Sequence, residues 1–427
     1  MNQRVVITGM GVVAPGALNL EAFHTMLYHG DSGIQFIQEL ADLGFSCQVG
    51  GMANPKSEPY KDCFNYFELN EASEFIKLAT VAGLECWLDA GLKIPIPGSE
   101  KVDWDTGAII GTGIGGIDTA GKKVIPMTDA GKVKRIGSFA IHNLMPSGPS
   151  AHLSSILGLG NQTTANSSAC CTGTEAILAG MHRIKSGLAE RMLVGGSECY
   201  SPYFWAGFDS LRALNRYSND QPQKASRPMS ASARGFIPAS GSGIMMVESL
   251  DAAKKRGARI YAEVLGGALN SGGQRNGGSM TFPNKDGVIR CLKQTFQNSG
   301  VHPSDIQLIS GHLTGTKADP VEIQNWNKVF RDAGTELPFI NAPKSIFGHT
   351  LGAAGIIESI AVILQMKNDF IHASLNCEDV HPEIESIINE TTIPHKRIDH
   401  SGIQHAIKAS FGFGDVNSAI IFKAWEA

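Results

Sequence analysis

The sequence predicts an α/β protein made of two similar halves, and three observations carry that prediction. A chain of 427 residues is too long for one ordinary core. Its 49 glycines, 18% charged residues and net charge of −4 are typical of a compact enzyme. In both halves a strand, a reactive residue and a helix rich in small residues follow one another. We therefore expect one half over residues 1–250 and another over 251–427.

The first half is centred on a cysteine pair at a junction between a strand and a helix. Cys170 and Cys171 precede a segment whose apolar residues recur at helical spacing, namely Ile177, Met181, Ile184 and Leu188. Unpaired N–H groups and the positive end of a helix favour a thiolate at such a place. Two buried cysteines that only fill space remain the alternative.

The second half places a histidine at each of two comparable positions. His312 follows a predicted strand at 305–309, and His349 follows another at 338–341 and opens a helix rich in Ala and Gly. A thiolate accepts acyl groups, and imidazoles donate hydrogen bonds to developing oxyanions. One cysteine with two such histidines therefore indicates acyl-thioester chemistry.

Two glycine-rich loops are candidates for phosphate binding, and we reject both. Gly9 to Ala14 matches the dinucleotide-binding pattern, but Pro15-Gly16 follows where a helix should begin. Gly111 to Gly116 lacks the Lys-Ser/Thr pair of a P-loop. We expect a tight turn behind a strand at the first loop, and close approach of the backbone to another element at the second.

Composition sets further expectations. The eight cysteines are scattered without a CxxC pair, so we expect no metal site, no disulfides and a reducing cytoplasm. No apolar run reaches the ~18–20 residues of a membrane span, and we expect no nucleic acid partner. The N-terminus lacks the plan of a signal peptide. A local basic cluster is either a solvated face or a docking site for an acidic partner; its members are Lys122, Lys123, Lys132, Lys134 and Arg135.

The ordered motifs of this chain resemble those of the elongating β-ketoacyl-acyl-carrier-protein synthases. The resemblance covers nearly the whole chain and implies a thiolase fold, with two similar halves stacked as a layered α-β-α-β-α core. The matching stretches, in order, are Val5 to Gly11, Gly113 to Gly116, Ala169-Cys170, Met280-Thr281, His312 with Thr314 and Thr316, Lys344-Ser345, Gly348-His349, Leu351 to Gly355, Glu358, and Phe411 to Gly414.

The resemblance implies roles for individual residues. Cys170 matches the acylated nucleophile, His312 and His349 the pair that drives decarboxylation, and Lys344 the lysine that organises His312. The backbone N–H groups of Cys170 and Phe413 match the oxyanion hole. The remaining matches concern substrate and partner: Thr281, Thr314 and Thr316 for the phosphopantetheine arm, Ile114, Phe411 and Phe413 for the acyl pocket and its gate, and Arg212 for the carrier protein. We add Lys132, Lys134 and Arg135 as candidate carrier contacts.

The implied reaction is decarboxylative Claisen condensation of malonyl-acyl-carrier protein with an acyl group on Cys170. It would extend a fatty-acid, polyketide-like or polyene chain with no cofactor besides the carrier's phosphopantetheine. The partners implied are an acyl carrier protein and a second subunit, identical or related. The alternatives are a chain-length-factor-like partner subunit, argued against by Cys170 and both histidines, and a priming or thiolase-type acyltransferase.

The chain departs from the family pattern at four places. Leu313 stands where the family has Gly, and Asp415 replaces the second glycine after the gate. The acidic residues usual near Arg227 and Arg234 are absent. These departures favour a specialised synthase over a housekeeping enzyme. A non-glycine residue adopts positive φ only at some cost. We therefore expect Asp415 either to stiffen the gate or to hold one gate position through a side-chain hydrogen bond to nearby backbone.

Overall fold

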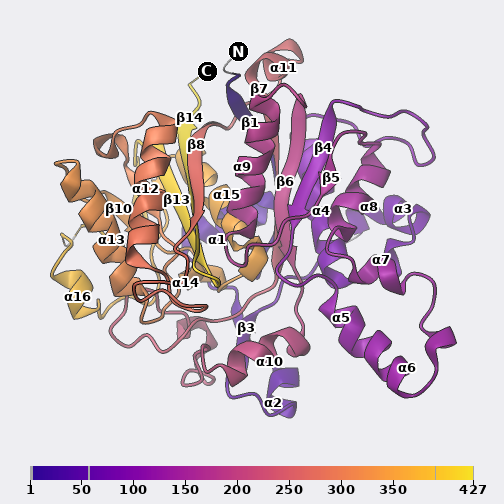
Figure 1. The fold of residues 1–427 in the computed structure, drawn as a ribbon, viewed down its shortest axis with the longest axis horizontal. Helices are drawn as coiled ribbons and strands as arrows, with labels where there is room; N and C mark the ends of the chain where they lie inside the picture. The colour runs from indigo at the N-terminus through magenta and orange to yellow at the C-terminus, as the bar shows by residue number, and fades with distance from the viewer. Residues whose placement is uncertain (1–2, 56–57, 390, 427) are drawn as a thin grey trace.

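The computed structural model describes residues 3–55, 58–389 and 391–426 as an α/β fold around one mixed sheet (Figure 1). Its strand order is β10-β9-β13-β14-β8-β1-β7-β6-β4-β5. The two halves meet where β1 pairs antiparallel with β8. The strands are β1 (Val5–Val13), β4 (Thr106–Gly111), β5 (Thr163–Thr164), β6 (Arg191–Glu198), β7 (Gly241–Ser249), β8 (Ala262–Ser271), β9 (Leu308–Ser310), β10 (Phe339–Asn341), β13 (His405–Gly412) and β14 (Val416–Ala424).

The same topology occurs in both halves. Counted outward from the centre, the first half runs β1-β7-β6-β4-β5 and the second β8-β14-β13-β9-β10. In each half the first strand is central, the last strand lies beside it, and the third strand is at the edge. The α/β class and the repeat of one unit are therefore as the sequence predicts. The boundary expected at residue 250 falls on the first residue of α11 (Leu250–Lys255).

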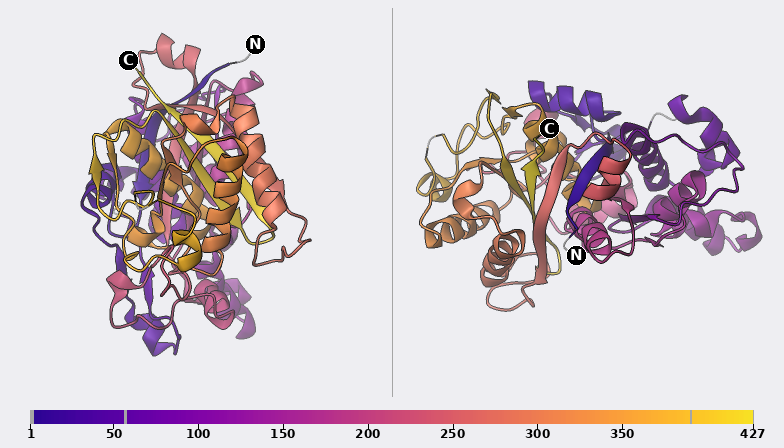
Figure 2. Two further views of the ribbon diagram at one scale, coloured as in Figure 1. Left: turned by 90° about the vertical axis from the view of Figure 1, so that its left-hand side faces the viewer. Right: turned by 90° about the horizontal axis from the view of Figure 1, so that it is seen from above.

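Helices form three layers around the two parts of the sheet. The central layer is α9 (Thr172–Lys185) with α15 (Ala354–Lys367), which contact each other and strands of both halves. The outer face of the first half is covered by α4 (Glu74–Asp89) and α8 (Gly148–Leu157), and that of the second by α12 (Lys285–Ser299) and α13 (Asp319–Asp332). Figures 1 and 2 show the central helices between the two parts of the sheet.

The other helices and strands are short and lie around this core. They are the helices α1 (Leu20–His29), α2 (Gln38–Asp42), α3 (Lys61–Tyr66), α5 (Ile117–Thr119), α6 (Ile125–Asp129), α7 (Ala140–Leu144), α10 (Pro202–Ser210), α14 (Lys344–Phe347) and α16 (Pro382–Glu385), and the strands β2 (Ile34–Phe36), β3 (Val49–Gly51), β11 (Phe370–Ile371) and β12 (Ile398–Asp399). The segment from α5 to α7, which we call the arm, projects from the body at the lower right of Figure 1. Among the described residues, no helix is long and apolar enough to cross a membrane.

The predicted helix after Cys170 ends earlier than its apolar pattern suggests. Ile177, Met181 and Ile184 are buried, as expected. The helix stops at Lys185, and Gly187 turns the chain at φ 71°. Leu188 is consequently 59% exposed and lies outside the buried stripe. A left-handed glycine is a common helix stop, and here it outweighs the periodicity.

The glycine loop after β4 approaches the backbone of another element, as the sequence predicts. Buried Glu198, the last residue of β6, accepts hydrogen bonds from the N–H of Gly113 at 2.8 Å and the N–H of Gly352 at 3.0 Å. A Cβ on Gly113 would lie 2.7 Å from that carboxylate. The loop is therefore held against the segment that follows His349.

Candidate active site

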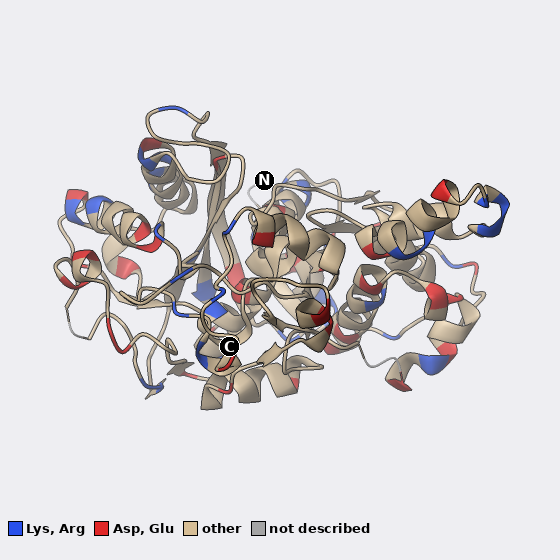
Figure 3. Ribbon diagram, turned by 90° about the horizontal axis from the view of Figure 1, so that it is seen from below, with Lys and Arg blue, Asp and Glu red and all other residues tan. Residues whose placement is uncertain are grey.

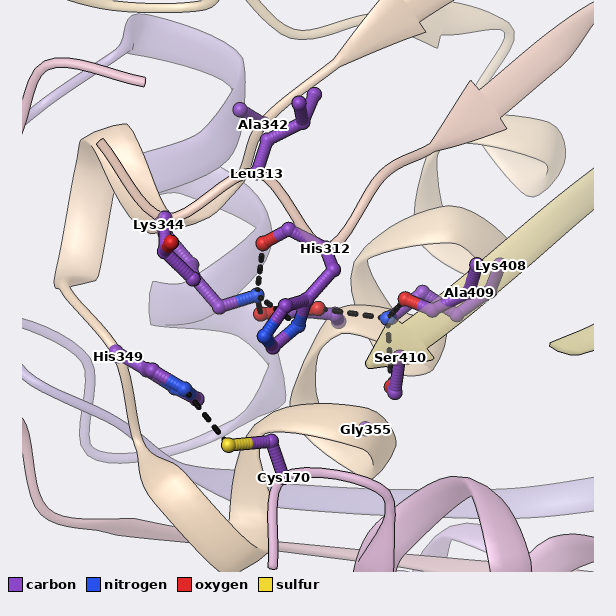
Figure 4. A network of polar contacts seen from close by, with 12 residues as sticks. Cys170, His312, Leu313, Ala342, Lys344, His349, Gly355, Lys408, Ala409 and Ser410 are labelled. Atoms are coloured by element: carbon purple, nitrogen blue, oxygen red, sulfur yellow. Dashed lines mark hydrogen bonds and ion pairs between the residues drawn. The ribbon is translucent and has the colours of Figure 1, made fainter. Parts of the chain in front are cut away.

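Cys170 lies just before α9 in a tight turn. Ala169 has φ 51°, a left-handed conformation that costs a non-glycine residue energy and directs the next side chain away from the helix core. The Cys170 sulfur lies 3.1 Å from Nε2 of His349 (Figure 4). Burial raises the pKa of this thiol to about 11, although the Lys344 charge and the N–H of Phe413 act in the opposite direction.

Cys171 points away from this site. It is the N-cap residue of α9 and is fully buried. Its Sγ lies 3.2 Å from the carbonyl oxygens of both Ser410 and Val416. Burial raises its pKa to about 12. Of the two adjacent cysteines, only Cys170 faces the histidines.

His349 is fixed in one tautomer by its own backbone neighbourhood. His349 follows α14, and its backbone N–H donates a hydrogen bond to the Ile237 carbonyl at 2.7 Å. The N–H of Leu351 donates to Nδ1 of His349 at 3.2 Å. The ring proton of the neutral imidazole is therefore on Nε2, which faces Cys170. Burial, followed by the charges of Lys344 and Lys408, holds the pKa of His349 well below its usual value.

His312 has the same tautomer for a different reason. It follows β9, and the Lys344 ammonium lies 2.6 Å from its carbonyl oxygen and 3.4 Å from its Nδ1. An ammonium can only donate, so Nδ1 accepts and Nε2 carries the proton. Burial, then Lys344 and His349, hold the pKa of His312 well below its usual value. The rings of His312 and His349 are 5.3 Å apart.

The structure brings the three predicted reactive groups together. Ligand-capable atoms of Cys170, His312 and His349 all lie within 4.8 Å of one another, and all three residues are buried. Cys and His are also ligands of zinc. A metal here would occupy the sulfur and both ring nitrogens that acyl chemistry needs free.

Two buried carboxylates support this group and were missed by the sequence analysis. Glu322 accepts hydrogen bonds from the N–H of His312 at 2.7 Å and of Leu313 at 2.8 Å. Asp319 accepts from the N–H of Thr314 at 2.9 Å. Burial raises the pKa of Glu322 to about 7. The available signal was their i, i+3 spacing at a helix start just after His312, where carboxylates can meet backbone N–H groups.

The structure explains the departures from the family pattern at Leu313 and Arg227. The backbone of Leu313 has a φ of 21°, a conformation that glycine adopts more easily than leucine. The buried Leu313 side chain packs over Gly311. Arg227 forms ion pairs with Glu378 and Asp379, both at 2.9 Å. The acidic partners lacking near Arg227 in the sequence are thus supplied by a distant segment.

The site opens into a cavity of about 770 Å³. The predicted substrate residues that line it, with Cys170, His312 and His349, are Thr281, Thr314, Thr316, Phe411 and Phe413. Thr314 and Thr316 share a hydrogen bond of 3.0 Å between their hydroxyls. Ile114 is not in this lining; it is 43% exposed on the glycine loop.

The predicted partner residues lie in two separate places. Arg212 lines the cavity at its mouth. Three further exposed cations line it too and were not singled out from the sequence: Arg216, Arg234 and Lys317. Lys132, Lys134 and Arg135 are exposed on the arm and do not line the cavity. Figure 3 shows the basic tip of the arm at the right-hand end, away from the body.

The chain belongs to the β-ketoacyl synthase family. The family model described as the N-terminal domain of β-ketoacyl synthase matches residues 2–253, and the one described as the C-terminal domain matches 261–378. The chain is 35% identical to the chloroplastic 3-oxoacyl-[acyl-carrier-protein] synthase I of Arabidopsis thaliana, over 99% of this chain and 87% of that protein. It is 31% identical to 3-oxoacyl-[acyl-carrier-protein] synthase 2 of Vibrio harveyi, over 99% and 98%. The predicted family and enzyme class, an acyltransferase that condenses acyl units, are confirmed.

Solved structures agree on the fold. One is a ketosynthase of a type II polyketide system bound to a hexaketide and in complex with its acyl-carrier protein, with 28% identity, a TM-score of 0.87 and full coverage of both chains. Another is the ishigamide ketosynthase/chain length factor, with 25% identity, a TM-score of 0.85 and full coverage of both chains. The predicted thiolase-like fold is thereby confirmed.

Proposed function

We propose that this protein is a β-ketoacyl-acyl-carrier-protein synthase that uses Cys170 as the acyl acceptor and His312 with His349 for decarboxylation. The observation that carries the proposal is the 3.1 Å contact of the Cys170 sulfur with His349 Nε2, with His312 beside both. Neighbouring groups fix both Nε2 atoms as donors. Such a pair suits an oxygen on which negative charge develops.

In the first half-reaction, the Cys170 thiolate attacks the carbonyl carbon of an acyl thioester on the carrier. A tetrahedral oxyanion forms and is held by the backbone N–H groups of Cys170 and Phe413. It collapses with loss of the phosphopantetheine thiolate, which takes a proton from solvent in place of the one that Cys170 released to solvent when its thiolate formed. The acyl group is now a thioester on Cys170.

In the second half-reaction, the C–C bond to the malonyl carboxylate breaks and CO₂ leaves. The electron pair forms an enolate whose oxygen accepts hydrogen bonds from Nε2–H of His312 and His349. The enolate carbon attacks the Cys170 thioester, and the resulting oxyanion returns to the same two backbone donors. Its collapse expels the Cys170 thiolate and releases the β-ketoacyl product on the carrier.

The test separates the two half-reactions. His312→Ala and His349→Ala should each lower malonyl decarboxylation by about 10²–10³, the usual cost of losing one oxyanion donor. At least one of them should still load an acyl group on Cys170, read by intact mass with a panel of acyl-carrier proteins. Normal condensation in either variant would refute the proposal.

The finer features remain part of the proposal. The product is a fatty-acid, polyketide-like or polyene chain, the carrier's phosphopantetheine is the only prosthetic group used, and the setting is cytoplasmic. For the partner subunit, the supporting observation is apolar exposure on the arm: Ile125 is 52%, Val133 60%, Phe139 52% and Ile141 59% exposed. We propose that this surface joins a second ketosynthase-like subunit, identical or related. Sedimentation equilibrium of the purified chain tests whether it self-associates.

A further inference from the structure

A second lysine, Lys408, is buried behind the histidines. It lies on β13, fully enclosed, opposite Ser310 of β9. Burying a charged lysine is costly unless every proton finds a partner. Its Nζ forms an ion pair with the Glu358 carboxylate at 2.8 Å and donates hydrogen bonds to the Ser410 hydroxyl at 3.0 Å and to the Ala409 carbonyl (Figure 4).

Glu358, on α15, is shared between two ammonium groups. Its Oε1 lies 2.5 Å from Lys344 Nζ and its Oε2 2.8 Å from Lys408 Nζ. The two oxygens are thus occupied on opposite sides, which fixes the rotation of the carboxylate. Lys344 in turn holds the carbonyl and Nδ1 of His312. A chain of contacts therefore runs from Lys408 through Glu358 and Lys344 to His312.

Lys408 is also linked, through Ser410, to the helix that follows Cys170. The Ser410 hydroxyl, one of its partners, lies 3.1 Å from the Thr174 hydroxyl in the first turn of α9. Lys408 thus links α15, the end of β13 and α9, three elements far apart in the sequence. Replacing it would remove the ion pair with Glu358 and the hydrogen bond to Ser410.

We propose that Lys408 is a positioning residue for decarboxylation: it orients Glu358 so that Lys344 meets His312, and its charge keeps both imidazoles in their neutral, donating form. This inference rests on the proposed function. Lys408 touches neither histidine directly. It acts on the two imidazoles through its contact with Glu358 and through the electrostatic effect of its charge.

The charges around the histidines support this role. The ionisable groups packed there are Lys344 on α14, Glu358 on α15, Lys408 on β13, Asp319 and Glu322 on α13, and Cys170 before α9. Two lysines share one carboxylate behind the histidines. After burial, which has the largest effect, both lysine charges act to lower the pKa of His312 and of His349.

The first experiment needs no substrate. In ¹⁵N-histidine-labelled protein, NMR titration should show both imidazoles neutral with the proton on Nε2 in the wild type. In Lys408→Met at least one of them should titrate at a pH higher by about half a unit or more, because a nearby positive charge has been removed. Ile407→Val, an apolar change at the adjacent residue of the strand, should leave both unchanged. Identical titrations in Lys408→Met and wild type would overturn the proposal.

The second experiment measures the half-reactions. Lys408→Met should lose about tenfold or more in malonyl-carrier decarboxylation, while single-turnover acylation of Cys170 stays within about threefold. Lys408→Arg should recover part of the loss. Equal losses in both steps, at native melting temperature, would overturn the role. If Lys408→Met does not fold, Lys408→Gln serves as the uncharged variant.

The two proposals fail in different ways. A wild type that never decarboxylates malonyl-carrier protein refutes the proposed function, whereas the NMR shift would still place Lys408 behind the histidines. An active wild type with unshifted imidazoles in Lys408→Met refutes only the role of Lys408.

Discussion

Adjacent residues of similar chemistry have opposite environments at the start of α9. Cys170 faces a cavity and a histidine, whereas Cys171 is enclosed against two backbone carbonyls. The turn at Ala169 and the helix that begins at Thr172 separate their directions. The proposed nucleophile and the packing residue are thus distinguished by position, since burial raises the pKa of both thiols.

This contrast predicts that iodoacetamide labels Cys170 and spares Cys171. The rate should rise about tenfold per pH unit through the neutral range, because the thiolate reacts and the pKa of Cys170, raised to about 11, lies above that range. Peptide mass mapping over pH 6–9 measures both site and rate. The Cys171→Ala variant is the control and should label normally. A labelled Cys170→Ala enzyme would contradict the assignment.

The residues that could be predicted from sequence are those that carry a recognisable motif. Cys170, His312 and His349 stand at ends of elements, and their order along the chain is informative. Glu322, Asp319 and Lys408 are ordinary charged residues until strand pairing places Lys408 opposite Ser310 and α13 folds back on His312. The role of Lys408 comes from long-range strand register, which no local pattern contains, whereas Asp319 and Glu322 had the local signal of their spacing at a helix start.

Among the elements, the β13–β14 hairpin matters most for substrate entry. Its turn carries Phe413, which lines the cavity, and Asp415, which has φ 62° and is buried. The Asp415 carboxylate accepts hydrogen bonds from the N–H of Gln274 at 2.9 Å and of Asn284 at 2.8 Å. The turn is thereby tied to the loop between β8 and α12. The structure matches the expectation of side-chain hydrogen bonds between Asp415 and nearby backbone.

We expect Asp415→Gly to release this loop and widen the range of acyl chains. Glycine adopts the positive φ without strain but cannot accept the two N–H groups. Amide hydrogen exchange at Gln274 and Asn284 should speed up, and single-turnover acylation of Cys170 by long chains should accelerate. Asp415→Asn is the matched control, since Asn tolerates the same φ and keeps one oxygen. Unchanged chain-length profiles in Asp415→Gly would place the hinge elsewhere.

At the scale of the whole molecule, duplication explains where the site is. The two halves meet at β1 and β8, and their central helices α9 and α15 pack together. Cys170 comes from the turn just before α9 in the first half, and both histidines come from the second half. The pocket thus forms where equivalent edges of the two halves converge. The chain's overall charge of −4 leaves recognition of an acidic carrier to local basic residues.

The structure separates two candidate docking patches that the sequence could not distinguish. Arg212 lies at the cavity mouth beside Arg216, Arg234 and Lys317, whereas Lys134 lies on the arm. Under the proposed function a carrier must place its phosphopantetheine in the cavity, so the mouth is the better docking site. Charged residues at the edge of an interface chiefly affect the rate at which the partners associate and the salt dependence of that rate.

We therefore expect Arg212→Glu to raise the KM for carrier-bound substrate by about tenfold, a loss that grows as ionic strength falls. Small acyl thioesters without a carrier should react nearly as before, because they present no acidic surface. Lys134→Glu makes the same charge change on the arm and should leave both substrates unaffected. Arg212 has φ 57°, so a melting curve must first show that its variant folds normally. Steady-state kinetics on both substrates at low and high salt provide the test. An equal loss of activity on carrier-bound and small thioesters would mean that Arg212 shapes the cavity entrance. A loss in Lys134→Glu that is confined to carrier-bound substrate would move the docking site to the arm.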